Sequence, residues 1–347
     1  MSIIKEIAYS LDDICIVPAS TSYINSRSQC NPFYKSFIYH SKSEVYTHTT
    51  LPVFTAPMPS VVNESNISTF IDNNITPVIP RSIPFDIRIK YATTEKYFVA
   101  FSLNEVMWFV DNKNIIANPS TPYKICIDIA NGNMTKLFDC IDLLKHVYGQ
   151  DIIIMSGNVA NKNSYRALND CGCDYVRVSI GTGSACTTAT NLGIYMPMAT
   201  LIDECNSCKG TAKIIADGGI SSYRNVIKAL ALGADFVMLG GMLNKLKDSA
   251  GEYVLQQDGK KYKVHFGMAS TKGQISLGKE KSLVPAEGKV VYNEMSENTI
   301  ADFSKELSQY LRSAMSYCEK STINDFIGNV SVRVMSENAT KQYNQLG

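Results

Sequence analysis

Cys186 lies in a loop that could place a thiol nucleophile beside a substrate. The loop, residues 181–188, reads Gly-Thr-Gly-Ser-Ala-Cys-Thr-Thr and combines two glycines with four hydroxyl side chains. Most cysteines are small buried hydrophobic residues, but these surroundings favour an accessible thiol that can ionise. The sequence ties none of the four histidines to this loop, so a papain-like Cys–His pair is not supported. The loop context therefore favours a catalytic cysteine of another kind.

Two pairs of glycines could hold a phosphate group. Gly218 and Gly219 follow one apolar segment, and Gly240 and Gly241 follow the next. Backbone N–H groups at such positions, or at the start of a helix, can approach a phosphate without interference from a Cβ atom. Glycine pairs also make ordinary tight turns, but two pairs after consecutive segments favour a phosphorylated ligand.

Eight short apolar segments recur along the chain. They cover residues 52–56, 76–79, 97–101, 125–129, 152–155, 175–178, 213–216 and 236–239. Continuous rather than alternating apolarity is typical of parallel strands that are buried on both faces. The segments between them, such as 136–144 and 225–230, have apolar residues at helical spacing.

This alternation predicts an α/β fold, namely a (β/α)₈ TIM barrel that forms one domain over residues 1–347. No GxGxxG motif follows the first strand, which argues against an open doubly wound sheet. In a barrel the active site lies where the strands end. The polar and glycine-rich residues at these ends are 128–132, 156–159, 181–188, 217–219 and 240–242.

The composition favours a small-molecule partner. The net charge is +1 and the basic residues are scattered, so the charge pattern of a nucleic-acid-binding protein is missing. The sequence has no signal-peptide pattern and no run of about 18 apolar residues, so we expect no membrane segment and a cytoplasmic location. The ten cysteines are then expected to be reduced thiols. Cys205 and Cys208 form a CxxC pair without the further ligands of a zinc site.

Several motifs together resemble the family that contains IMP dehydrogenase and GMP reductase. They cover residues 11–18, 56–58, 128–132, 157–159, 181–188, 216–219 and 233–243, so the likeness runs nearly end to end. The resemblance implies that Cys186 adds to C2 of a purine and forms a covalent thioimidate. A nicotinamide cofactor would exchange hydride at the same carbon.

Further features look more like the reductase branch of this family. The chain has no inserted regulatory (CBS) domain between the early strands, and segments 257–261, 266–270 and 311–317 are similar to reductases. A mobile flap is expected over residues 270–292, and it lacks the Arg-Tyr pair with which dehydrogenases activate water. The resemblance therefore implies NADPH-dependent reductive deamination of GMP to IMP and ammonia. The alternatives are an IMP dehydrogenase without its regulatory domain and a non-catalytic purine-nucleotide-binding relative.

The resemblance also implies roles for individual residues. Cys186 would be the nucleophile, and Thr188 and Glu287 would protonate the leaving amine. The purine mononucleotide would contact Ser184, Asp217, Gly218, Gly219, Gly240, Gly241, Gly267, Met268 and Gly288, with Asp217 at the ribose hydroxyls. NADPH would contact Asp128, Ala130, Asn131, Arg312 and Ser313, the last two from the same or a neighbouring subunit of a homotetramer. A K⁺ ion would bind the backbone carbonyls of Gly181, Gly183 and Cys186.

A few positions depart from the family pattern. Ala189 stands where arginine usually follows Cys-Thr-Thr, and Thr182 stands where proline usually separates the loop glycines. Pro59 replaces an aspartate, and Phe266 replaces a tyrosine whose hydroxyl reaches the phosphate. The spacing after Glu287 is shorter than usual, so this residue could instead be a later glutamate of the flap. These differences indicate a diverged member of the family.

Overall fold

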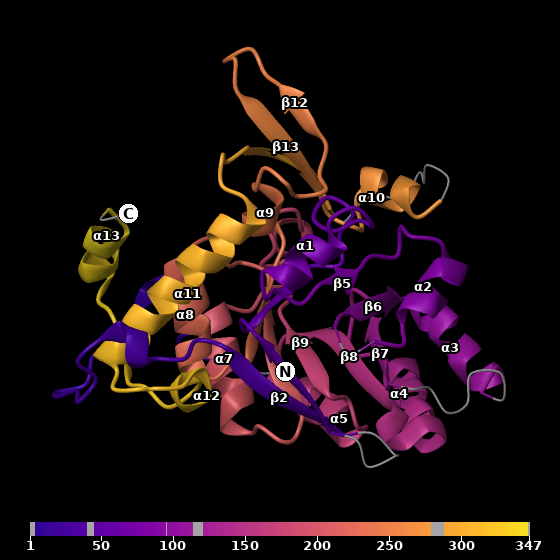
Figure 1. Ribbon diagram of the computed structural model, residues 1–347, viewed down its shortest axis with the longest axis horizontal. Coiled ribbons are helices and arrows are strands. Elements are labelled where there is room, and N and C mark those ends of the chain that lie inside the picture. The colour runs from indigo at the N-terminus through magenta and orange to yellow at the C-terminus, as the bar shows by residue number, and fades with distance from the viewer. Residues whose placement is uncertain (1–3, 40–44, 95, 114–120, 279–287, 346–347) are drawn as a thin grey trace.

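The computed structural model describes residues 4–39, 45–94, 96–113, 121–278 and 288–345. Its centre is an eight-stranded parallel sheet in the order β4-β11-β10-β9-β8-β7-β6-β5 (Figure 1). The strands are β4 (Val53–Thr55), β5 (Val78–Ile79), β6 (Phe98–Phe101), β7 (Tyr123–Ile127), β8 (Ile152–Val159), β9 (Tyr175–Val178), β10 (Lys213–Asp217) and β11 (Phe236–Leu239). A parallel bridge from Phe54 to Thr76 joins the two ends of this order. The predicted (β/α)₈ barrel is confirmed.

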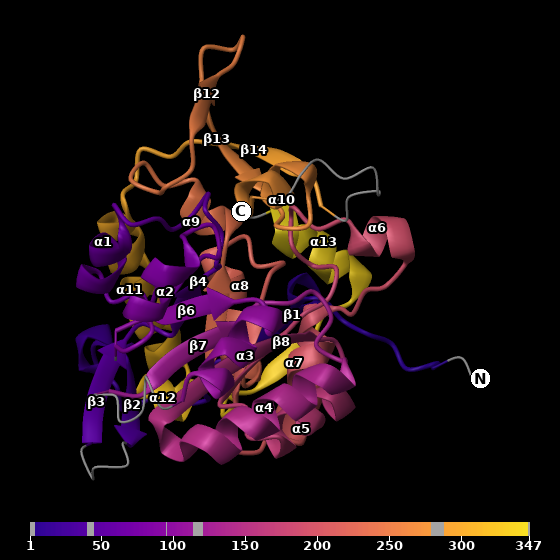
Figure 2. The same cartoon turned by 90° about the vertical axis from the view of Figure 1, so that its right-hand side faces the viewer.

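Helices surround the barrel (Figure 2). They include α1 (Ile67–Asp72), α2 (Phe85–Tyr91), α3 (Leu103–Asp111), α4 (Thr135–Tyr148), α5 (Lys162–Asp170), α7 (Met198–Ser207), α8 (Tyr223–Leu232) and α11 (Ile300–Tyr317). In α4, Leu137, Ile141 and Leu144 recur at helical spacing and are fully buried. Both helical segments predicted from the sequence lie inside α4 and α8.

Every predicted strand segment overlaps a barrel strand, although β7 begins and ends two residues before the predicted segment 125–129. The agreement follows from the burial of these strands on both faces. All residues of β6, β7 and β11 are buried. The end of β8 differs from the prediction, since residues 156–159 belong to the strand rather than to the following loop. A shift in register between Gly157 and Val159 lets β8 continue its pairing with β9 beyond the apolar segment.

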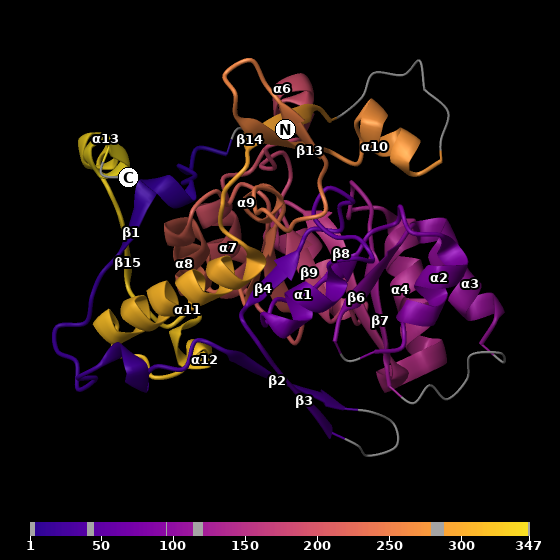
Figure 3. The same cartoon turned by 45° about the horizontal axis from the view of Figure 1, so that its top comes forward.

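Smaller elements lie around the barrel. Two strand pairs lie outside the barrel sheet, β1 (Ile14–Ile16) with β15 (Val332–Val334) and β2 (Tyr34–Tyr39) with β3 (Val45–Thr50). The short helices are η1 (Leu11–Asp13), η2 (Arg27–Gln29), η3 (Gly149–Asp151), α6 (Thr188–Leu192), α9 (Gly241–Asn244), α10 (Thr271–Ser276), α12 (Ile323–Phe326) and α13 (Glu337–Gln345). An antiparallel sheet of β12 (Tyr253–Leu255), β13 (Lys261–Phe266) and β14 (Val290–Glu294) projects from the barrel (Figure 3). Within the described part of the chain, no helix is long and apolar enough to cross a membrane.

Candidate active site

The Cys186 loop connects β9 to α6. The Cys186 thiol donates a hydrogen bond to Thr188, with 3.2 Å between Sγ and Oγ1. The backbone N–H of Cys186 donates to the carbonyl of Gly183 at 3.0 Å, which closes a tight turn just before the cysteine. Cys186 is only partly buried, as expected for a residue that meets a ligand. The structure thus brings together two of the three predicted catalytic residues.

The base of the flap packs directly on this loop. Gly288 forms an antiparallel bridge with Cys186, and the N–H of Lys289 donates to the carbonyl of Ala185 at 3.0 Å. A Cβ atom on Gly267 would lie 2.7 Å from the same carbonyl oxygen, so only glycine lets β13 end this close to the loop. The predicted substrate-binding residues Gly267 and Gly288 therefore lie against the catalytic loop.

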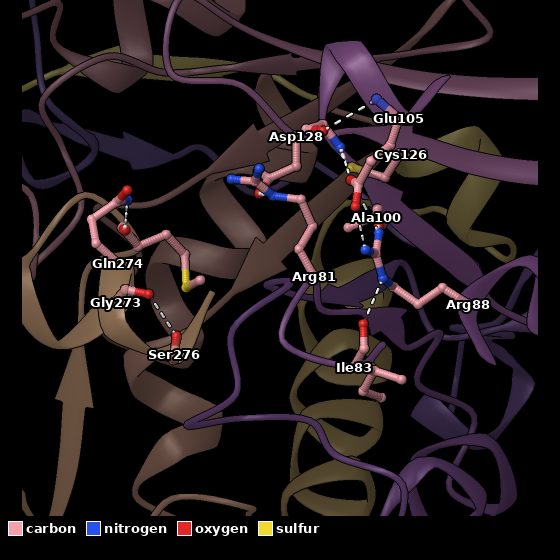
Figure 4. Close-up of polar contacts among 12 residues, drawn as sticks. Arg81, Ile83, Arg88, Ala100, Glu105, Cys126, Asp128, Gly273, Gln274 and Ser276 are labelled. Carbon is pink, nitrogen blue, oxygen red and sulfur yellow. Dashed lines mark hydrogen bonds and ion pairs between the residues drawn. The ribbon is translucent and has the colours of Figure 1, made fainter. Parts of the chain in front are cut away.

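Two other predicted site residues, Glu287 and Met268, have different outcomes. Glu287, the third predicted catalytic residue, lies outside the described residues. Met268 lies between β13 and α10, and its carbonyl accepts a hydrogen bond from Gln274 Nε2 at 2.6 Å. Figure 4 shows the Gln274 side chain in this contact.

The glycine pair after β10 packs against the catalytic loop. Gly218 and Gly219 have φ angles of 88° and 71°, in the left-handed region that favours glycine. A Cβ atom on Gly218 would lie 3.1 Å from Thr182 Oγ1, and one on Gly219 would lie 3.0 Å from Thr182 Cβ. Thr182 also shares a hydrogen bond with Ser179, with 2.7 Å between the hydroxyl oxygens. The unusual threonine at this position therefore has its own partners in the loop.

The second glycine pair connects β11 to α9. A Cβ atom on Gly241 would lie 3.5 Å from the hydroxyl oxygen of Ser184, which is exposed. The structure thus places Ser184 beside the predicted phosphate-binding glycines. Because α9 has only four residues, separate N–H groups and the serine hydroxyl, rather than a helix dipole, would bind an anion here.

Arg177 links the predicted cofactor side of the site to the predicted ribose side. It lies in β9 with 8% of its side chain exposed, and it pairs with Asp128 at 3.0 Å and with Asp217 at 2.9 Å. Burial alone would lower the pKa of Arg177, but the carboxylates of Asp217 and Asp128 outweigh it and hold this pKa above its ordinary value. Arg177 therefore stays charged and fixes both carboxylates.

Two neighbours complete this charged network. Asn158 donates to Asp217 Oδ2 at 2.7 Å. Arg81 donates to Asp128 Oδ2 at 3.1 Å, and both of these side chains are labelled in Figure 4. The network thereby joins residues at or near the ends of five barrel strands. Burial raises the pKa of the nearby Cys126 thiol to about 12, so this cysteine is no second nucleophile.

The sequence placed residues 156–159 at the active-site end of the barrel but gave Asn158 no individual role, and it did not indicate Arg177 or Arg81. A usable signal existed for Arg177, because a charged residue inside a continuous apolar strand must find a partner when the strand is buried. Arg81 and Asn158 gave no comparable signal, since polar residues near strand ends are common on any barrel.

The predicted cofactor residues fall into two groups. Ala130 and Asn131 follow Asp128, and both are exposed, so this segment fits a nicotinamide cofactor lying against a fixed carboxylate. Arg312 and Ser313 lie on α11, where Arg312 donates to the carbonyl of Cys30 and Ser313 accepts from Arg27 at 3.2 Å. Within the described residues, no hydrogen bond or ion pair joins Arg312 or Ser313 to Asp128 or to the Cys186 loop.

The predicted K⁺ site consists of backbone carbonyls. The carbonyl of Gly183 already accepts the Cys186 N–H, but a carbonyl oxygen has two lone pairs and can take a second partner. Oxygen donors of this kind suit K⁺, so the loop fits the ion chemically. In the described ranges, no group of three or more His, Cys, Asp or Glu side chains could hold a metal.

Comparison with known proteins agrees with this geometry. Residues 122–344 match the family described as the IMP dehydrogenase / GMP reductase domain. The GMP reductase of Vibrio atlanticus is 32% identical over 317 residues, which cover 87% of this chain and 88% of that protein. The GMP reductase of Buchnera aphidicola subsp. Acyrthosiphon pisum is 31% identical over 306 residues, which cover 84% of each chain. The chain belongs to the IMP dehydrogenase / GMP reductase family.

Proposed function

We propose that this protein is a GMP reductase, an oxidoreductase that converts GMP to IMP and ammonia with NADPH. The observation that carries the proposal is the Cys186–Thr188 hydrogen bond, in a loop that packs on Gly288 and on the glycines after β10. Relatives named GMP reductase support this choice of substrate. We further propose a cytoplasmic homotetramer that binds K⁺ at the loop carbonyls of Gly181, Gly183 and Cys186.

Substrate binding would use the residues at the strand ends. Ser184 and the glycine pairs would surround the phosphate, and Asp217 would accept from the ribose hydroxyls. Asn158 and Arg177 both contact Oδ2 of Asp217, so Oδ1 can accept hydrogen bonds from the sugar. The two contacts also fix the orientation of the carboxylate before substrate arrives.

The chemistry would proceed on the purine C2 carbon. The Cys186 sulfur adds to C2, the amino group leaves as ammonia, and a covalent thioimidate remains. Thr188 Oγ1 is hydrogen-bonded to the thiol, so it is placed to pass the thiol proton toward the leaving amine. Glu287 would be the acid partner, a role supported by its place in the sequence beside Gly288, which pairs with Cys186. NADPH, when bound beside Asp128, supplies the hydride that replaces sulfur at C2.

The test compares reduction of GMP with oxidation of IMP, which are two separate reactions. Purified protein is incubated with GMP and NADPH, and separately with IMP and NAD, while NADPH and purine products are followed. We expect NADPH loss that matches IMP formation, and no turnover by the Cys186→Ala variant. Turnover only with IMP and NAD would identify a dehydrogenase. Binding of GMP without turnover in either reaction would identify a non-catalytic relative.

A further inference from the structure

We propose that His265 binds the 5′-phosphate of the nucleotide through Nε2, together with Ser184 and the glycines Gly240 and Gly241. This inference rests on the proposed function, and it assigns a phosphate ligand that the motifs of the sequence did not reveal. His265 lies near the end of β13, far from the catalytic loop in the sequence, and its side chain is 3% exposed.

The imidazole of His265 lies beside Gly240. A Cβ atom on Gly240 would lie 3.4 Å from Cε1 and 3.5 Å from Nε2 of His265. A Cβ atom on Gly241 would lie 3.5 Å from the hydroxyl oxygen of Ser184. The two side chains therefore approach neighbouring glycines of the same pair, one from β13 and one from the catalytic loop. An anion that binds the N–H groups of this pair would lie within reach of both.

The hydrogen bond of the His265 ring indicates which ring nitrogen is free to bind the phosphate. Nδ1 lies 3.0 Å from the hydroxyl oxygen of Ser60, which is itself buried. When this hydroxyl donates to Nδ1, the ring hydrogen is on Nε2, the nitrogen that approaches Gly240. Nε2 has no hydrogen-bond partner within the described part of the chain. Nε2 is not among the fully buried side-chain atoms that lack a partner, so this edge of the ring stays accessible to a phosphate oxygen.

Neighbouring charges do not offer another ligand for the phosphate on this face of β13. Lys263 lies two residues before His265, so both side chains leave the strand on the same side. Its ammonium donates to the carbonyls of Ser249 and Gly251 at 2.8 and 2.9 Å, and it is 4% exposed. Burial lowers the pKa of His265 to about 4, so the free protein presents a neutral N–H donor near neutral pH.

This role also accounts for a departure from the family pattern. Phe266 stands where a tyrosine hydroxyl usually reaches the phosphate, and its ring is buried under the ammonium of Lys272. The residue just before it, His265, would supply the donor that phenylalanine lacks. We therefore expect phosphate recognition to be retained with a different side chain.

The test compares GMP with guanosine, which lacks the phosphate. His265→Phe removes the N–H donor but keeps an aromatic ring, and dissociation constants are measured by calorimetry. We expect GMP to bind about 10- to 100-fold more weakly, because a hydrogen bond to a charged group is lost. Guanosine should bind as tightly as it does to the unchanged protein. His146→Phe, at an exposed position on α4, is the matched control and should change neither affinity.

A second pair of measurements covers the case in which His265→Phe does not fold. His265→Gln keeps an amide donor near Nε2 and should retain more GMP affinity than His265→Phe. In the unchanged protein, histidine-selective nitrogen NMR should show the Nε2 signal of His265 shifting with GMP but not with guanosine.

The outcomes separate this inference from the proposed function. If the unchanged protein reduces GMP, and the folded His265→Phe variant binds GMP with unchanged affinity, the role of His265 is wrong and the function stands. A His265 signal that ignores GMP has the same meaning. If the unchanged protein neither binds nor reduces GMP, both proposals fail.

Discussion

The thiol of Cys186 has one polar side-chain partner among the described residues, and that partner is Thr188. The two histidines whose side chains are described lie elsewhere, His265 bonded to Ser60 and His146 exposed on α4. The shortest route for the thiol proton therefore passes through the Thr188 hydroxyl. Single substitutions can test this proton transfer, the Arg177 ion pairs and the buried imidazole of His265.

Replacing Thr188 with alanine should slow turnover far more than it weakens binding. A positioned proton-transfer group contributes about 10²- to 10⁴-fold, so kcat should fall by roughly that factor while the dissociation constant of GMP stays nearly constant. Thr188→Ser keeps the hydroxyl and should retain most of the activity. An equal loss of kcat in the serine and alanine variants would show that the hydroxyl does not carry the proton.

Removing the charge of Arg177 should destabilise the folded protein. Arg177→Met leaves the carboxylates of Asp128 and Asp217 without their shared partner, and breaking a buried pair costs about 3–5 kcal/mol. Urea denaturation measures this loss, and Arg177→Lys should lose less because it keeps a cation. A methionine variant as stable as the unchanged protein would mean that solvent already compensates these carboxylates.

The buried imidazole of His265 should make folding stability depend on pH. Its pKa is lowered to about 4 from an ordinary value of 6.5, so between these values the unfolded chain takes up a proton that the folded chain does not. Stability should therefore fall with decreasing pH, by about 2 kcal/mol between about pH 7 and about pH 5 from this residue. His265→Gln should show a shallower loss over this range in urea denaturation. Identical slopes would contradict the buried, neutral state of His265.

At the scale of elements, the catalytic loop is held by strands that the sequence did not reveal. The eight barrel strands were predictable because burial on both faces makes them continuously apolar. By contrast, β12 (Tyr-Val-Leu) and β14 (Val-Val-Tyr-Asn-Glu) have only three consecutive apolar residues each, and these are exposed or partly buried. Such short runs do not distinguish a strand from a loop. The predicted site residues on the loop and the glycine pairs came together, but their contact with β13 and β14 depends on long-range packing. For the same reason, the position of His265 beside Gly240 could not be predicted.

The close approach of β13 to the loop predicts a specific sensitivity at Gly267. In Gly267→Ala, the new methyl group would meet the Ala185 carbonyl at 2.7 Å, so the loop or the strand must move. We expect a loss of about 1–3 kcal/mol in stability and a larger fall in kcat than in substrate affinity. Gly259→Ala, in a turn where a Cβ atom would meet nothing within 4 Å, is the control and should keep turnover despite its backbone strain. Full activity in Gly267→Ala would show that the loop does not depend on this contact.

Over the barrel as a whole, charged and amide side chains from five strand ends form one network, whereas Arg312 and Ser313 on α11 have other partners. If these two residues contact the cofactor, a neighbouring subunit would have to supply them. In that case the oligomeric state would be part of the proposed cofactor site. The sequence could not decide it, because packing between copies leaves no pattern within one barrel.

Mixing two inactive variants tests a shared cofactor site. Cys186→Ala lacks the nucleophile and Arg312→Ala lacks the proposed cofactor contact, so each should turn over poorly alone. Subunits refolded together should regain part of the activity, because some sites then combine an intact Cys186 with an intact Arg312 from the neighbour. No recovery in mixed oligomers that light scattering shows to have formed would mean that Arg312 does not act on the cofactor of a neighbouring subunit.

In the proposed reaction, the Cys186 sulfur forms a bond to the purine. The most direct measurement is acid quenching of the enzyme during turnover of labelled GMP with NADPH, followed by mass spectrometry of the peptide that contains residues 181–188. We predict a purine nucleotide adduct on Cys186, and none on the Cys186→Ala variant, which still binds GMP but does not turn over. Undiminished GMP reduction by Cys186→Ala would contradict the account.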